Sequence, residues 1–473
     1  MLRRFGLEAV VVAVAAAVFG WKVGSPSPWW DEAVTRDVVA RPVADILALA
    51  GQVDLVHLAY YLFLHLVTGG DGGFVALRLV CVVAAALTAG LLVRLGRQLD
   101  QPRVGGCAGV LYAVSPLASR YAQEARAYAL VTLIATAATV ALLHALRRPG
   151  RRNWAGYTAL LVIGGLLNLL SVLILVPHLV HVLAGADRAN RRRWAVAAGA
   201  GVLGLLPLAV GASRQRGQID WLPRPGLSTL VQFLLAQYTA GLLTALVVLA
   251  AAVGLRPATG NRRPPHRGAL LLGTAWALLP PVLLWLVSQL HPLFDWRYVI
   301  FCLPGTALAI ASLATLLRPL GTAVVVTALA LGGLHLQQVY RRPAIGHAED
   351  LRGAARFVQQ DGAPGDAVLF LPGERRVLAL AYPQAFERVD DLALAVDPTS
   401  SGTLYGVETD PAGLVVALQD RTRVWVVTGS PRLGPAESAT DREKRRLLAA
   451  GFRLAGTRQT YKWQVLLYRR AAT

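Results

Sequence analysis

Charged residues are scarce in this chain. They make up 16% of its 473 residues, whereas 55% of the residues are hydrophobic. Ordinary soluble domains contain about 25% charged residues. Several apolar runs approach or exceed the ~20 residues that a helix needs to cross a lipid bilayer. The composition therefore excludes an ordinary soluble protein and predicts a chain that crosses the membrane many times.

Cysteine is rare as well. The three cysteines are Cys81, Cys107 and Cys302, and all of them are scattered through apolar segments. No pair has the spacing of a metal site, and the polar C-terminal part contains none. The cysteines therefore predict neither a disulfide framework nor a metal centre.

Acidic residues are outnumbered by basic ones. The chain has 27 Asp and Glu but 47 Lys and Arg, which gives a formal net charge of +20. Such an excess is also typical of nucleic-acid-binding proteins. Here, however, the basic residues are nearly all arginine and lie in short clusters between apolar runs. This arrangement follows the positive-inside rule of membrane proteins. We therefore predict no nucleic-acid partner.

The first apolar run, about residues 7–23, is not followed by a small-x-small cleavage site. It is therefore predicted to remain as a first membrane span, not to be removed as a signal peptide. Arg3 and Arg4 precede it. By the positive-inside rule they place the N-terminus in the cytoplasm.

Ten further spans are predicted. The uncharged stretch 154–185 is too long for one helix across a ~30 Å hydrocarbon core, and Asn168 and Ser171 offer a polar turn that divides it into two short spans. With this division the arginine clusters between spans all fall on the side of Arg3. The remaining spans lie near residues 74–94, 104–118, 127–146, 194–211, 229–255, 268–289, 298–317 and 320–336. We therefore predict a multi-pass plasma-membrane protein of about eleven spans, with a cytoplasmic N-terminus and an extracytoplasmic C-terminus.

Two polar regions interrupt this pattern. The first is an outer loop, residues 24–73, in which residues 56–67 are apolar but too short to span and predict an interfacial helix. The second begins near residue 340, so the chain is divided into a membrane domain, 1–339, and a small extracytoplasmic α/β domain, 340–473. The elements predicted in the second domain are a helix at 349–360, strands at 366–371 and 423–428, a charged helix at 441–450 and a strand pair at 452–469. Gly-x-Gly-x-x-Gly and Gly-x-x-x-x-Gly-Lys sequences, which bind nucleotides, are absent from it.

Asp31 and Glu32 are adjacent carboxylates that follow the first span, in the sequence Trp-Trp-Asp-Glu. Charges at a membrane boundary are costly and tend to be functional. Outer arginines run against the positive-inside trend, and their planar guanidinium groups suit phosphate oxygens. We interpret Arg78 and Arg126 in this way. For three other outer arginines, pairing with lipid headgroups or loop acids is an equal alternative: Arg214, Arg216 and Arg224.

The histidines of the first loop do not form one metal site. His57 and His65 are eight residues apart, two turns along one helix, so they do not bind the same ion. Asp54 and His57 are three residues apart. They are either half a metal site or an oriented histidine, with simple loop packing as the alternative. The aromatic residues of the outer loops are interpreted as an interface belt in preference to sugar-binding platforms: Trp29, Trp30, Tyr60, Tyr61 and Trp296.

The outer segments resemble the membrane-embedded glycosyltransferases of the GT-C superfamily, in particular bacterial relatives of the protein O-mannosyltransferases and of the lipid A aminoarabinose transferase. The resemblance is carried by the Asp31-Glu32 pair and by residues 51–57, 60–61, 76–79, 119–128, 218–222 and 294–298. It implies an enzyme that moves a sugar, mannose or another hexose or pentose, from a polyprenyl-phosphate donor to an acceptor hydroxyl. The acceptor would belong to a cell-envelope glycan, a glycolipid or a protein. The C-terminal part departs from the eukaryotic protein mannosyltransferases, which weakens the case for a protein acceptor.

The resemblance also implies roles for individual residues. Asp31 matches the acid that serves as base, and Glu32 is its neighbour, which orients Asp31, the acceptor or a metal. Four arginines are expected near the donor phosphate: Arg78, Arg126, Arg297 and Arg120. The substrate-binding residues expected from it are Asp54, His57, Tyr61, Tyr121, Glu124, Tyr128 and Tyr298. No metal ligand is assigned, a divalent cation is left open, and no other cofactor is expected.

The chemistry of these residue types agrees with such a reaction. Nucleotide sugars are scarce outside the cytoplasm, so a lipid-phosphate sugar is the natural donor there. A single inverting displacement needs one carboxylate as base and arginines to stabilise the departing phosphate. Two other classes stay open, a lipid-linked sugar flippase or transporter and a non-catalytic envelope assembly protein. The gathering of polar residues at one face and the lack of a paired inverted repeat argue against a transporter.

Overall fold

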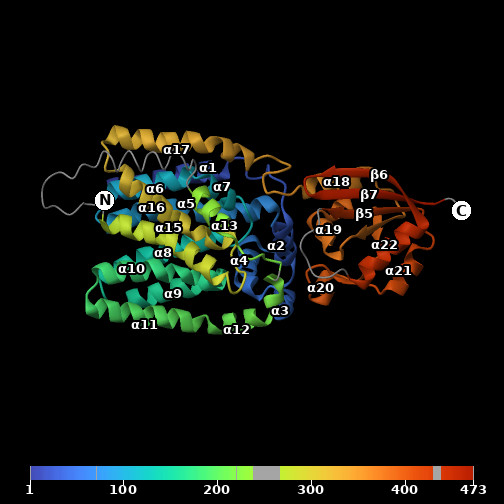
Figure 1. Cartoon of the computed structure of the whole chain (residues 1–473), viewed down its shortest axis with the longest axis horizontal. Coiled ribbons are helices and arrows are strands. Elements are labelled where there is room, and N and C mark those ends of the chain that lie inside the picture. Colours follow the sequence, from blue (N-terminus) through green and yellow to red (C-terminus); the bar gives the residue numbers. More distant parts are fainter. Residues whose placement is uncertain (1, 71, 220, 238–266, 430–437, 472–473) are drawn as a thin grey trace. The chain divides into compact units, whose positions relative to one another are not determined.

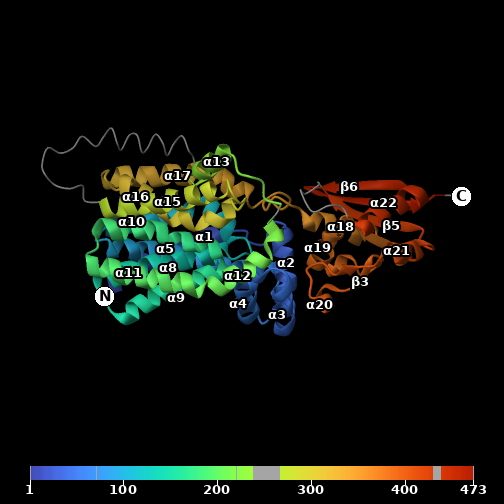
Figure 2. The same ribbon diagram turned by 60° about the horizontal axis from the view of Figure 1, so that its bottom comes forward.

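The computed structural model describes residues 2–70, 72–219, 221–237, 267–429 and 438–471. The chain forms two compact units, and each is built from two separate stretches of sequence. The helical unit contains Met1–Val23 and Arg78–Gln338, and the mixed unit contains Gly24–Leu77 and Val339–Thr473. Figure 1 and Figure 2 show the helices of the former and the sheet of the latter.

Six helical segments among the described residues are long and apolar enough to cross a bilayer, by length and composition. They are Phe74–Gln98 (α5), Tyr128–Arg147 (α8), Arg188–Arg214 (α11 and α12), Arg267–Val287 (α15), Trp296–Ala314 (η4 and α16) and Pro319–Val339 (α17). The chain is therefore a mostly helical, multi-span membrane protein. The total of eleven spans stays a prediction, and residues 238–255 of the predicted span 229–255 lie outside the described residues.

Shorter helices lie within or beside the other predicted spans. They are Leu2–Gly20 (α1), Pro102–Val114 (α6), Pro116–Ala122 (α7), Arg151–Leu167 (α9), Leu169–Ile174 (η2), Leu175–Gly185 (α10) and Leu227–Ala236 (α13). The predicted break in 154–185 is confirmed at Asn168, whose Oδ1 accepts a hydrogen bond from the backbone N–H of Leu170 at 2.9 Å. This bond satisfies a donor that the start of a helical turn leaves open.

Small residues let the helices of this unit approach closely. A Cβ added to Gly96 of α5 would lie 2.3 Å from the Cα of Gly105 in α6. A Cβ on Gly273 of α15 would lie 2.6 Å from the backbone nitrogen of Ala309 in α16. Lipid tails are as apolar as leucine, so helices in a membrane associate by such close packing and not by a hydrophobic force between them.

The mixed unit is built on a five-stranded sheet with the order β2-β1-β5-β7-β6. These strands are Val389–Asp391 (β2), Asp366–Phe370 (β1), Arg423–Gly429 (β5), Trp463–Arg470 (β7) and Phe452–Thr460 (β6). β1 pairs in parallel with β2 and β5, and β7 pairs antiparallel with β5 and β6. Leu394–Val396 (β3) and Val407–Glu408 (β4) form a separate pair. The α/β character predicted for this region is confirmed, together with the strands and the strand pair.

The helices of this unit come from both of its stretches. The first stretch gives Trp30–Ala40 (α2), Val43–Gln52 (α3), Leu55–His57 (η1) and Leu58–Thr68 (α4). The predicted helix at 56–67 is thus confirmed, while its place at the membrane surface stays a prediction. The second stretch gives Leu351–Asp361 (α18), Gly373–Arg376 (η5), Val377–Ala381 (α19), Pro383–Ala385 (η6), Pro398–Ser401 (α20), Pro411–Leu418 (α21) and Ala439–Gly451 (α22).

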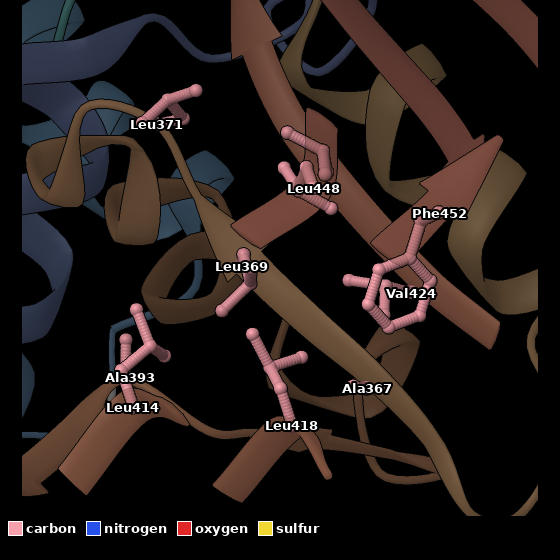
Figure 3. Close-up of a cluster of buried hydrophobic side chains, with 10 residues drawn as sticks. Ala367, Leu369, Leu371, Ala393, Leu414, Leu418, Val424, Leu448 and Phe452 are labelled. Carbon is pink, nitrogen blue, oxygen red and sulfur yellow. The ribbon is translucent and has the colours of Figure 1, made fainter. Parts of the chain in front are cut away.

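The core of the mixed unit lies against the two parallel central strands. All five residues of β1 are buried, as expected for a strand that is covered on both faces. Leu369 of β1 and Val424 of β5 pack with Leu418 of α21 and Leu448 of α22 (Figure 3). The sheet is therefore fixed by apolar packing near its centre.

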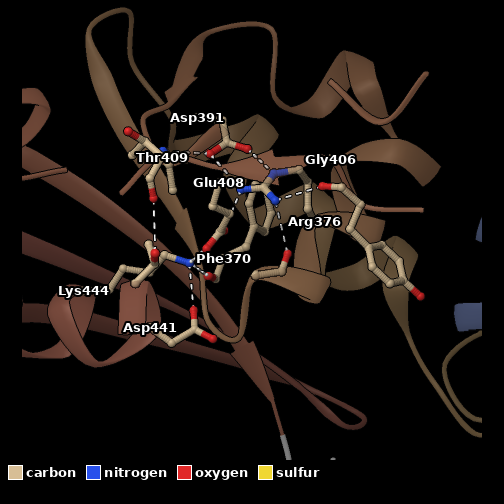
Figure 4. Close-up of polar contacts among 12 residues, drawn as sticks. Phe370, Arg376, Asp391, Gly406, Glu408, Thr409, Asp441 and Lys444 are labelled. Carbon is tan, nitrogen blue, oxygen red and sulfur yellow. Dashed lines mark hydrogen bonds and ion pairs between the residues drawn. The ribbon is translucent and has the colours of Figure 1, made fainter. Parts of the chain in front are cut away.

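A buried ion network crosses the same unit (Figure 4). Lys444 is fully buried, and its Nζ donates hydrogen bonds to both carboxylate oxygens of Glu408, at 2.8 and 2.7 Å, and to Asp441 Oδ1 at 2.8 Å. Arg376 donates to Glu408 at 2.8 Å and to Asp391 at 2.5 Å. The network therefore joins α22, β4, η5 and β2 through hydrogen bonds between oppositely charged groups.

Candidate functional site

The acid pair lies in the first turn of α2. The backbone N–H of Trp29, the residue before the helix, donates a hydrogen bond to Glu32 Oε2 at 3.4 Å. Carboxylates are favoured at this end of a helix because unpaired backbone N–H groups point toward them. Glu32 is completely buried, whereas Asp31 is only half-buried. The two neighbouring carboxylates thus have different environments.

Glu32 is bound by a residue far along the chain. The Nδ1–H of His347 donates a hydrogen bond to Glu32 Oε2 at 2.9 Å, and both side chains are fully buried. A buried carboxylate is costly unless hydrogen-bond donors satisfy it. The pair therefore holds Glu32 in place inside the mixed unit. Sequence reasoning missed His347, because nothing near it in the sequence marks it as a partner of α2.

Asp54, His57 and Tyr61, which were predicted to bind substrate, lie together in the same unit. Asp54 has a left-handed backbone, with φ of 60°, at the start of η1, a conformation that aspartate tolerates. Its Oδ2 accepts a hydrogen bond from the Tyr61 hydroxyl at 2.7 Å. The rings of His57 and Tyr61 have their centroids 5.9 Å apart. No group of three or more His, Cys, Asp or Glu side chains that could hold a metal ion occurs among the described residues.

Tyr405 is a further member of this group that the sequence did not reveal. Its hydroxyl accepts a hydrogen bond from the indole N–H of Trp30 at 2.7 Å. Burial, and then the negative charges of Glu374, Asp54 and Asp31, raise the pKa of Tyr405 well above its usual value. The phenol therefore stays protonated at neutral pH and sits in the field of three carboxylates.

The interpretation of the loop aromatics as an interface belt is wrong for three of them. Trp30, Tyr60 and Tyr61 are 4%, 0% and 1% exposed. Such side chains pack inside the protein and are not available to a lipid headgroup region. A Trp or Tyr beside an apolar run looks the same in sequence whether lipid or protein covers it.

In the helical unit, two predicted phosphate-binding arginines are buried. Arg78 of α5 is 1% exposed, and its Nη1 donates a hydrogen bond to the carbonyl oxygen of Val23 at 2.9 Å. Arg126 is 5% exposed. Cys81, one turn beyond Arg78, donates from Sγ to the carbonyl oxygen of Arg126 at 3.4 Å. Since residues three apart share a face of a helix, the two arginines belong to the same region of the unit.

The loop that carries Arg126, between α7 and α8, is tied to the end of the first helix. Gln123 is 1% exposed, and its Nε2 donates hydrogen bonds to the carbonyl oxygens of Phe19 and Trp21 at 2.6 and 2.8 Å. The end of α1 is thus joined to the loop between α7 and α8. A glutamine side chain fixes a loop in this way because it satisfies two carbonyl groups that a helix end leaves open.

The other two predicted arginines are paired with acids. Arg120 lies 2.5 Å from Glu124, and Arg297 lies 3.0 Å from Asp295. Burial, and then the charges of Glu124 and Asp295, raise the pKa of Tyr121, whereas the positive charges of Arg120 and Arg297 oppose this shift. Both ion pairs therefore act electrostatically on Tyr121, and the guanidinium carbon of Arg120 lies 5.8 Å from the centre of its ring.

Two more predicted residues lie beside these pairs. The Tyr128 ring meets the Tyr121 ring edge-on, with centroids 5.6 Å apart. Tyr298 follows Arg297 in η4 and is half-buried. The helical unit thus contains the four arginines, Tyr121, Glu124, Tyr128 and Tyr298, while the mixed unit contains Asp31, Glu32, Asp54, His57 and Tyr61.

Comparisons with known proteins show a family match over part of the chain and a similar fold among solved structures. Residues 56–213 match the family described as dolichyl-phosphate-mannose-protein mannosyltransferase. No curated protein matches the chain at a significant level. Among solved structures, the chain is similar to ArnT from Cupriavidus metallidurans, bound to undecaprenyl phosphate and in the apo state. Each comparison gives a TM-score of 0.61 and 13% sequence identity and covers 98% of both chains.

A weaker likeness connects the chain to the apo form of the Archaeoglobus fulgidus oligosaccharyltransferase. It has a TM-score of 0.47 and 11% identity, and it covers 90% of this chain and 69% of that chain. At 13% identity, the likeness to ArnT establishes a shared fold.

Proposed function

Since residues 56–213 match the dolichyl-phosphate-mannose-protein mannosyltransferase family and the chain has the fold of ArnT, we propose that it transfers a sugar from a polyprenyl-phosphate donor to an extracytoplasmic acceptor hydroxyl. The recognition of a membrane glycosyltransferase from the sequence is confirmed by the family match. The sugar, mannose or another hexose or pentose, and the acceptor, a cell-envelope glycan, glycolipid or protein, belong to the proposal. So does the orientation, with the N-terminus in the cytoplasm and residues 24–73 and 340–473 outside.

Asp31 is the base of the proposed reaction. The observation that carries this assignment is the contrast in burial between Asp31, which is half-buried, and Glu32, which is fully buried and hydrogen-bonded to His347. Asp31 takes the proton of the acceptor hydroxyl. The acceptor oxygen then bonds to the anomeric carbon of the sugar, and the bond between that carbon and the phosphate oxygen breaks. The phosphate leaves with the electron pair, and the configuration at the carbon is inverted.

Arg78 and Arg126 bind the donor phosphate in this proposal. Both are buried, and buried guanidinium groups make strong charge-assisted hydrogen bonds with phosphate oxygens. They also stabilise the negative charge that develops on the leaving phosphate. Arg120 and Arg297, which are neutralised by Glu124 and Asp295, shape the surroundings of that charge.

Replacing both Arg78 and Arg126 with alanine is expected to raise the KM for the donor by about 100-fold or more, because each charge-assisted hydrogen bond contributes roughly 1.5–3 kcal/mol. The double lysine variant keeps the charge but loses the planar fork, so an intermediate KM is expected. The measurement is the initial rate of transfer in membranes as the donor concentration is varied. Arg152→Ala is the matched control, because Arg152 is exposed in the same unit and belongs to an arginine cluster predicted on the other side of the membrane. A donor KM that does not change in the double alanine variant would remove both residues from phosphate binding.

The proposed activity is tested by incubating membranes that contain the protein with polyprenyl-phosphate sugar, labelled separately in the sugar and in the lipid. Transfer moves the sugar label out of the lipid extract while the lipid label remains there. A flippase carries both labels across the membrane together without separating them. An assembly protein without activity leaves both labels where they were added.

A further inference from the structure

The segment that leads into the acid pair is fastened by residues from the second stretch of the mixed unit. The backbone N–H of Ser27 donates to the carbonyl oxygen of Pro343 at 2.8 Å, and the backbone N–H of Arg352 donates to Ser27 Oγ at 3.0 Å. The guanidinium group of Arg352 also donates to the carbonyl oxygens of Gly24, Ser25 and Pro26, at 3.2, 3.2 and 3.4 Å. The approach to α2 is therefore fixed by hydrogen bonds from residues 343–352.

Trp30, the residue before Asp31, is held by a second group of contacts. Its backbone N–H donates to Glu349 Oε2 at 3.1 Å. Its ring stacks on Trp463 with centroids 5.9 Å apart and an interplanar angle of 21°. The guanidinium carbon of Arg375 lies 5.3 Å from the Trp30 ring and 4.7 Å from the Trp463 ring.

These contacts make Trp30 an anchor and not a surface for sugar. Trp30 and Trp463 are 4% and 1% exposed, so no ligand reaches their faces. Aromatic stacking and cation–π contacts of this kind are strongest when they are desolvated. The hydrogen bond from Trp30 to Tyr405 and the bond from His347 to Glu32 complete the attachment on either side of Asp31.

We propose that His347 is a positioning residue for sugar transfer, because it fixes the Glu32 carboxylate and thereby the neighbouring Asp31. The C-terminal α/β part of the chain, which supplies His347, thus contributes to the reaction site. This inference rests on the proposed role of Asp31 as base. Asp31 and Glu32 share one helical turn, so a shift of Glu32 moves Asp31 with it. A displacement of about 1 Å at a reacting group reduces a rate by roughly 100-fold.

The atom that makes the contact allows a sharp test. Nδ1 of His347 is the donor, and the side-chain nitrogen of asparagine lies at the same number of bonds from the Cα as Nδ1 does. The nitrogen of glutamine lies one bond farther, where Nε2 is found in histidine. His347→Asn therefore keeps a donor for Glu32, His347→Gln moves it, and His347→Ala removes it.

The experiment measures kcat and the KM for donor and acceptor of the full chain in membranes, per amount of folded protein, with the thermal unfolding temperature of each variant. We expect His347→Gln and His347→Ala to lower kcat by about 10- to 100-fold, with little change in either KM. His347→Asn is expected to recover most of the wild-type kcat. His65→Asn is the matched control, because His65 Nδ1 contacts the carbonyl oxygen of Val39 in the same helix α2, at 2.8 Å, and not a carboxylate. It is expected to keep the wild-type kcat.

Two results would overturn the proposal while leaving the function intact. One is a wild-type kcat in folded His347→Ala and His347→Gln, and the other is an equal loss in all three His347 variants that follows their unfolding temperatures. If the wild-type protein transfers no sugar, or if its transfer does not depend on Asp31, the proposed function is wrong. The positioning role of His347 then falls with it. The two failures are therefore distinguished by the wild-type protein and the Asp31 variant alone.

Discussion

Asp31→Asn is expected to lower sugar transfer by about 1,000-fold or more, with the protein still present and folded in the membrane. A positioned general base contributes about 10²–10⁴-fold to a rate, and an amide of the same shape does not accept the proton. The loss of one carboxylate at a helix N-terminus costs only about 0.3–1 kcal/mol of stability. Transfer is measured as the release of labelled sugar from the lipid donor, per amount of folded protein.

Two variants make this result specific. Asp45→Asn also removes an acid from the first turn of a helix in the same stretch, α3, and is expected to keep wild-type transfer. Glu32→Gln keeps a side chain that accepts from His347, so we expect a loss smaller than that of Asp31→Asn. Wild-type transfer by Asp31→Asn contradicts the assignment of the base, and a larger loss in Glu32→Gln than in Asp31→Asn reverses the two roles.

Lys444→Met is expected to destabilise the mixed unit by about 3–5 kcal/mol, the usual cost of removing one partner from a buried ion pair. Methionine has a similar length but leaves Glu408 and Asp441 without the ammonium group that donates to both of them. For a part of this size the change corresponds to a fall of about 6–20 °C in the unfolding temperature. Thermal unfolding of the purified full chain in detergent is the measurement.

Lys462→Met is the control for this prediction. Lys462 is exposed in the turn between β6 and β7 and has a positive φ of 67°, a conformation that lysine and methionine tolerate equally poorly. Its replacement removes the same charge without opening the buried network. An unfolding temperature of Lys444→Met within about 2 °C of the wild type would show that the network does not stabilise the unit in this way.

Much of the fold follows from local pattern. Apolar runs fix the helices of the membrane part, and a single Asn168 marks where an uncharged stretch divides, because its side chain replaces a lost backbone hydrogen bond. The period of apolar residues likewise predicts β1, β5 and the β6–β7 pair. These features depend on residues that are near one another in sequence, and so the sequence shows them.

The environment of the site does not follow in the same way. The partners of Trp30 and Glu32 include Tyr405, Trp463 and His347, which are separated from them by most of the chain. No periodicity records such contacts, and each partner by itself looks like an ordinary loop or strand residue. The grouping of Gly24–Leu77 with Val339–Thr473 in one compact unit has the same origin.

The roles of the arginines could be predicted from the sequence only in part. Arg78 was distinguished by its place inside an apolar run, where a charge is costly, and its burial agrees with that reasoning. The ion pairs of Arg120 and Arg297 were not predicted as pairs, although Glu124 and Asp295 lie within four residues of them. Several acids lay within reach of the outer arginines, so spacing alone did not select the partners.

The discontinuous mixed unit also has a consequence for the order in which the protein becomes complete. Trp30 leaves the ribosome early, whereas Trp463, which stacks on it, is made near the end of translation. At about 5–20 residues per second, the interval between them is tens of seconds. During that time all the membrane helices are inserted while the segment with Asp31 and Glu32 waits for its partners. A nascent or truncated chain therefore carries both acids without the contacts that set their position, and the proposed site is complete only when the last strand of the sheet has formed.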